Sequence, residues 1–78
     1  MARPGDGAVR KRSVSLRGHR TSVSLEDAFW EALQDLARAE GETLSALIAR
    51  IDEARGDASL SSALRVHALG AFREMADR

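Results

Sequence analysis

Cysteine is absent from this chain of 78 residues, which excludes a disulfide framework and a thiolate metal site. Histidine occurs only twice, at His19 and His67, with no carboxylate cluster near either, so we expect neither a metal nor a cofactor. No apolar run approaches the ~20 residues of a membrane span. The first twelve residues also lack the apolar core of a secretory signal. These absences favour a cytoplasmic protein without a membrane partner.

The features of an enzyme are missing as well. The sequence contains no nucleophile beside a base and no phosphate-binding loop, and a chain of 78 residues leaves little room for a substrate pocket. We therefore expect no enzymatic activity. A domain of this size is marginally stable alone, and small domains without disulfides or metals usually gain stability by oligomerising.

Charge is distributed unevenly although the net charge is zero. Residues 1–24 carry six basic side chains and one acidic one, a balance of +5. Residues 25–78 carry six arginines and eleven acids, a balance of −5. A basic N-terminal segment on an acidic body is typical of a nucleic-acid-binding arm, although a solvated tail gives the same pattern.

The tetrapeptide Ser-Val-Ser-Leu occurs twice, at residues 13–16 and 22–25. In both copies, apolar and polar residues alternate with the period of a half-buried strand. The first copy has three possible structures: an extra strand beside a ribbon, a hairpin folded onto the second copy, or a basic arm. We favour an arm or a short outer strand. Residues 1–11 then form a flexible basic tail, and residues 12–78 form the folded domain.

Three helices are expected after the second copy. Residues 26–40 show an apolar stripe at helical spacing and end at Gly41, which suits a left-handed C-terminal stop. Thr43 is placed to cap a second helix that ends at Gly56. A third helix is expected over residues 61–76, with Ser59 or Ser61 as its cap.

The stretch "HRTSVSLEDAFWEALQDLARAEGETLSALIARI" resembles a ribbon-helix-helix domain, the fold of the Arc and methionine repressors. The wider sequence is similar to a bacterial subfamily with an extended N-terminal segment and an additional C-terminal helix. The resemblance implies a mainly α fold with a short β-ribbon, in an intertwined homodimer that can assemble further on DNA. Strands from two chains would pair and enter the major groove of double-stranded DNA.

Alternation within the second copy places Arg20, Ser22 and Ser24 on one face, and the resemblance makes this the base-reading face. Ser24 has a second possible role as the cap of the first helix. The resemblance also places DNA phosphate at the backbone amides of Leu44 and Ser45, where the second helix begins. The remaining expected phosphate contacts are basic side chains: Arg10, Lys11, Arg12 and Arg17.

The dimer core is expected to comprise the apolar residues of the ribbon and the first two helices. They are Val23, Leu25, Phe29, Trp30, Leu33, Leu36, Leu47, Ile48 and Ile51. The leading hypothesis for function is a transcriptional regulator, a repressor. The alternatives are an antitoxin that also binds a toxin protein, and a dimerisation or adaptor module without DNA binding. The apolar stripe of the third helix favours a helix folded onto the domain or a second oligomer surface.

Overall fold

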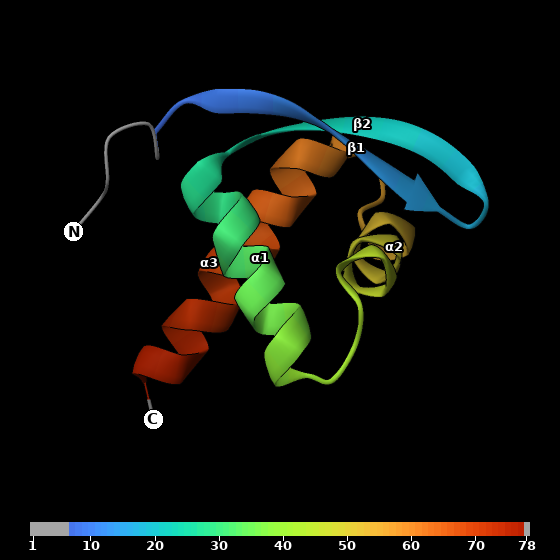
Figure 1. Ribbon diagram of the computed structural model, residues 1–78. Coiled ribbons are helices and arrows are strands. Elements are labelled where there is room, and N and C mark those ends of the chain that lie inside the picture. The colour runs from blue at the N-terminus through green and yellow to red at the C-terminus, as the bar shows by residue number, and fades with distance from the viewer. Residues whose placement is uncertain (1–6, 78) are drawn as a thin grey trace.

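A two-stranded ribbon covers three helices in the computed structural model, which describes residues 7–77 (Figure 1). Strand β1 spans Val9–Leu16 and strand β2 spans His19–Glu26. Helix α1 spans Asp27–Ala39, α2 spans Leu44–Ala54 and α3 spans Leu60–Ala76. The expected order of elements, a ribbon followed by three helices, is confirmed.

The two Ser-Val-Ser-Leu copies pair with each other as an antiparallel hairpin. The favoured prediction of an arm or outer strand was therefore wrong. Arg17 and Gly18 form the turn with φ of 51° and 82°, and two positive φ values match the twist of a tight hairpin. Val14 and Leu16 are buried, so β1 also has its own apolar face to pack against the helices.

The hairpin changes two further expectations. β1 begins at Val9, so residues 9–11 lie in the ribbon, although the prediction assigned them to a tail. Of the rest of that tail, residues 7 and 8 lie directly before β1, and residues 1–6 lie outside the described residues. In addition, β2 pairs with β1 of its own chain, where the resemblance implied a strand from a second chain. The intertwined homodimer stays a prediction.

The helix ends follow local signals. Thr43 caps α2 by accepting a hydrogen bond from the Ala46 N–H at 3.0 Å, as expected. Ser59 caps α3, so the first of its two predicted caps is the one used. Gly41 follows α1 with φ of 70°, as a left-handed stop requires. Ser24 does not cap α1, because the N-cap position falls on Glu26 and Ser24 remains in β2.

The core lies between the ribbon and the helices and is formed within one chain. Seven of the nine predicted core residues are buried there, whereas Phe29 and Trp30 are half-buried. α3 contributes Leu64 and Ala68, which are 0% and 1% exposed. The third helix is therefore folded onto the domain. Its outer side exposes four large apolar side chains: Val66, Leu69, Phe72 and Met75.

Candidate nucleic-acid interface

The outer face of the ribbon consists of short polar and basic side chains. Antiparallel pairing sets Lys11 opposite Ser24, Ser13 opposite Ser22 and Ser15 opposite Arg20. All six residues are exposed, because the alternate positions of each strand face the core. The structure thus brings the three predicted reading residues together on one solvent-facing surface. We call the six residues the outer face.

Half of the outer face was missed by the sequence reasoning. Ser13 and Ser15 were not proposed as contacts, and Lys11 was proposed only for phosphate. The signal that could have identified them is the period-two alternation of the first copy, which has the same phase as the second. Lys11 and Arg20 are the two cations of this face, and its other four residues are serines.

Arg10 and Arg12 point toward the opposite side of β1 and are engaged within the chain. Arg10 Nε lies 3.2 Å from Asp27 Oδ2, and Arg12 donates from Nη2 to Asp27 Oδ1. The Arg12 guanidinium also lies 4.9 Å from the centroid of the Trp30 ring, a cation–π contact. Two of the predicted phosphate contacts therefore hold the ribbon against α1.

Replacing Arg12 by Ala is expected to lower the free energy of unfolding by about 1–2 kcal/mol. The Arg12 side chain is 18% exposed, so its removal takes away the cation–π contact and the packed stem as well as an ion pair. Arg10→Ala is the matched control, because Arg10 pairs with the same carboxylate but is 61% exposed. Its loss should stay within about 1 kcal/mol. Urea unfolding of both variants measures the difference, and equal losses would contradict this role for Arg12.

Arg17, at the turn of the hairpin, forms ion pairs with the C-terminal part of α2. Its Nη2 lies 2.7 Å from Asp52 Oδ2 and its Nη1 lies 2.8 Å from Glu53 Oε1. The hydrogen bond to Glu53 raises the pKa of Arg17. Hydrogen bonds from Arg55 and then Arg17 hold the pKa of Asp52 below its ordinary value. Arg17 is thus paired with two carboxylates of α2, and its contact with phosphate stays a prediction.

The start of α2 carries its own carboxylates. Ser45 is exposed and Leu44 is half-buried, as a phosphate site at this helix end allows. However, Glu40 and Glu42 precede the helix, and both accept hydrogen bonds from Arg50, at 3.0 and 2.6 Å. The bond from Arg50 lowers the pKa of Glu42, which therefore stays ionised. Negative charge beside the helix end opposes the attraction of its amides for phosphate.

The start of α3 bonds to the edge of β2 that faces away from β1. The Ser24 N–H donates to Ser61 Oγ at 3.1 Å, and Arg65 Nη2 donates to the Ser24 carbonyl at 3.2 Å. Arg65 Nε also lies 2.9 Å from Glu26 Oε1. The pKa of Glu26 is lowered by its own backbone N–H and then by Arg65. No local pattern in the sequence indicates this contact, because 37 residues separate Ser24 from Ser61.

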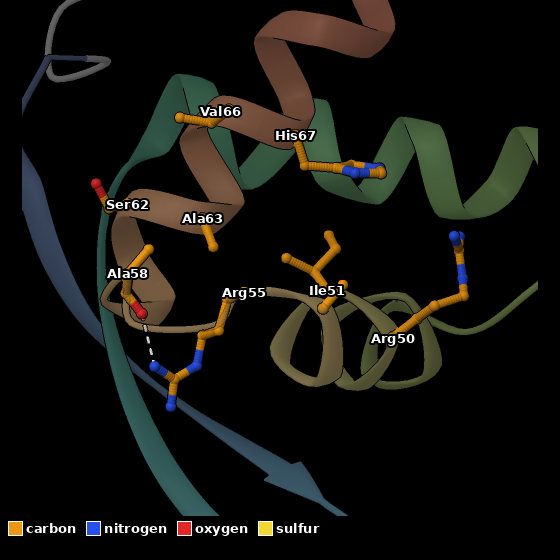
Figure 2. A pocket seen from close by; sticks show the side chains of 9 residues that line it. Arg50, Ile51, Arg55, Ala58, Ser62, Ala63, Val66 and His67 are labelled. Atoms are coloured by element: carbon orange, nitrogen blue, oxygen red, sulfur yellow. Dashed lines mark hydrogen bonds between the residues drawn. The ribbon is translucent and has the colours of Figure 1, made fainter.

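A cavity of about 410 Å³ lies between α2 and α3 (Figure 2). Ile51 and Val66 contribute to its apolar lining, and Arg50, Arg55 and His67 are its basic side chains. The Arg55 guanidinium donates to the Ala58 carbonyl and to Asp52, and Arg50 is held by its two glutamates. Both arginines thus have partners already. Within residues 7–77 no group of three His, Cys, Asp or Glu could hold a metal ion.

The comparisons with known proteins agree with this architecture. The family model for the ribbon-helix-helix domain matches residues 9–72, from the start of β1 into α3. The chain therefore belongs to the ribbon-helix-helix domain family, whose members are typically DNA-binding regulators or antitoxins. No curated protein matches the sequence. None of the helices in the described part of the chain has the length and apolarity needed to cross a membrane.

A solved structure is similar over almost the whole chain. It is that of an uncharacterized protein from Bordetella pertussis Tohama I, which is 37% identical with a TM-score of 0.82. The match covers 97% of this chain and 65% of the Bordetella protein. The chain thus spans slightly less than two thirds of that protein's length.

Proposed function

We propose that this protein is a dimeric, sequence-preferring double-stranded DNA-binding protein that acts as a transcriptional repressor in the bacterial cytoplasm. The observation that carries the proposal is the outer face of the ribbon. A two-stranded ribbon has the width that the major groove admits, and here all six outer side chains are exposed and polar. Lys11 and Arg20 can contact guanine or phosphate, and the serines are short enough for a close approach to the base edges.

The salt dependence of DNA binding tests this function. Each phosphate neutralised by a basic side chain releases counterions, so the affinity should fall about ten- to a hundredfold between about 50 and 200 mM salt. Fluorescence anisotropy on duplexes selected from a random pool measures this fall. A scrambled duplex of the same length is the control for sequence preference. Binding no tighter than about micromolar, with no response to salt, would exclude the proposal.

The second candidate function is that of an antitoxin, and the exposed apolar side chains of α3 favour it. Val66, Leu69 and Phe72 follow one another at intervals of three residues and are 69%, 56% and 41% exposed. Exposed apolar side chains gathered on one helix are typical of a protein-interaction surface. Co-purification of a toxin with the chain, lost when Leu69 is replaced by Glu, would favour this function. An adaptor module would instead recover a protein partner and show no affinity for DNA.

A further inference from the structure

The cavity between α2 and α3 is bounded by short side chains where the two helices face each other. Ala54 of α2, Ala63 of α3 and Ala58 of the connecting loop all line it. Larger apolar side chains at these positions would fill the space that the alanines leave. The cavity volume of about 410 Å³ lies within the range of small-molecule sites, which is roughly 300–1,000 Å³. Its size therefore suits a small molecule and does not admit a folded domain.

Two side chains at one end of the cavity have hydrogen-bond donors that are not in use. Figure 2 shows Arg50 and His67 at this end, with Arg55 and Ala58 at the other. Arg50 binds both of its glutamates through Nη2, so among residues 7–77 its Nε and Nη1 have no partner. The His67 side chain likewise makes no hydrogen bond within the described part of the chain. Because a guanidinium has donors only, a ligand at this end must supply an acceptor.

The charges around the cavity favour a neutral ligand. Glu40 and Glu42 lie 3.0 and 2.6 Å from Arg50 Nη2. Asp52 Oδ1 lies 2.6 Å from Arg55 Nε. An anion bound at Arg50 would approach two carboxylates that already compensate this cation, and a cation would meet the guanidiniums on the cavity wall. A neutral acceptor can use the unpaired N–H groups without either repulsion.

The apolar part of the wall supplies a second kind of contact. Ile51 and Val66 line the cavity, and Val66 is 69% exposed to solvent. Covering apolar surface removes it from water, which favours binding in proportion to the area covered. One molecule must therefore combine a hydrogen-bond acceptor at the Arg50 end with an apolar body beside Ile51.

We propose that this cavity binds a small neutral molecule with a carbonyl oxygen and an apolar body, such as a ketone or an ester. Arg50 and His67 donate hydrogen bonds to the carbonyl oxygen, and the apolar body lies along Ile51 toward Ala58. None of the described residues that line the cavity belongs to the outer face of the ribbon, so the ligand and DNA occupy different surfaces. The inference therefore goes beyond the proposed function and stands without it.

Binding of methyl hexyl ketone tests the site, because this molecule combines one carbonyl oxygen with an apolar chain. Titration into the isotope-labelled full chain should shift the amide resonances of Ile51, Ala54 and Ala63, with a Kd of about 0.1–1 mM. Octanoate and octylammonium are the matched ligands, since they carry a similar chain with a negative or a positive charge. Each should bind at least about fivefold more weakly than the ketone.

Three variants locate the ligand. Ala63→Leu places a larger side chain in the cavity and should abolish the shifts. Arg50→Ala removes the unpaired donors and should weaken binding of the ketone about tenfold, as expected for a lost hydrogen bond to a charged group. Arg38→Ala is the matched control, because it removes the same charge from an arginine that pairs with Asp35 on α1, outside the cavity. It should bind the ketone as the wild type does.

Two results of the titrations would overturn the proposal. One is the absence of a saturable shift with the ketone, as expected if a second copy of the chain filled the cavity. The other is equal affinity for the ketone and octanoate. Equal binding of the ketone by Arg50→Ala and Arg38→Ala would overturn it as well, because the carbonyl oxygen would then have no donor at Arg50. If Ala63→Leu fails to fold, the two arginine variants decide the question, since both arginines are exposed.

Discussion

Replacing Leu64 by Ala is expected to remove about 2–5 kcal/mol from the free energy of unfolding. Leu64 is 0% exposed and belongs to the core cluster that joins α3 to the ribbon and the other helices. Truncation loses the burial of its side chain and leaves a cavity that close-packed neighbours fill only in part. A domain of this size has a total stability of roughly 4–12 kcal/mol, so the loss is a large fraction of it.

Leu69→Ala is the matched control on the same helix. Its side chain is 56% exposed, so the same chemical change should alter stability by less than about 1 kcal/mol. Urea denaturation followed by circular dichroism gives the free energy of unfolding of both variants. If the slope of this free energy against urea concentration equals that of the wild type, the compactness of the native and denatured states is unchanged. A loss at Leu64 as small as the one expected at Leu69 would mean that α3 is not part of the core.

The helices could be read from the sequence because their signals are local. Thr43 is followed by an apolar face at helical spacing, and Gly41 is at the position where a left-handed residue ends α1. The buried positions followed for the same reason, since periodicity identifies the inward face of each element. The burial of Leu33 and Ile48 could be predicted without knowing which residues pack against them.

The hairpin could not be settled in the same way. The choice between an arm and a strand depended on the backbone of Arg17, a residue that rarely adopts a positive φ. Its two ion pairs to α2 join residues 35 and 36 positions apart in the chain, and such contacts leave no periodic trace in the sequence. The same holds for the bonds of α3 to Ser24.

The charge asymmetry of the sequence has two physical components. Arg10, Arg12 and Arg17 are matched by acids of the helical body, so part of the basic segment serves the fold. Lys11 and Arg20 stand on the outer face. Net charge alone could not separate the two groups, because the separation depends on which side of the ribbon each side chain occupies.

Arg20→Ala is expected to weaken binding to a selected duplex by about 1–3 kcal/mol and to relax the preference at one base position. Arg20 is exposed on the outer face, where its guanidinium can reach two acceptors of one guanine. Competition between the selected duplex and a duplex changed at that position measures the preference directly. A uniform loss on both duplexes would instead identify Arg20 as a phosphate contact.

Two further variants separate charge from position and from geometry. Arg17→Ala removes the same charge three residues away, from a side chain that is bound to Asp52 and Glu53, and should change affinity less than threefold. Arg20→Lys keeps the charge but loses the planar pair of donors, so it should retain the salt dependence and lose the guanine preference. Base reading by Arg20 requires a particular order of affinities for the selected duplex. Arg17→Ala should bind nearly as tightly as the wild type, Arg20→Lys should bind less tightly, and Arg20→Ala should bind most weakly. If Arg17→Ala were as weak as Arg20→Ala, the distinction between the tip of the hairpin and its outer face would be wrong.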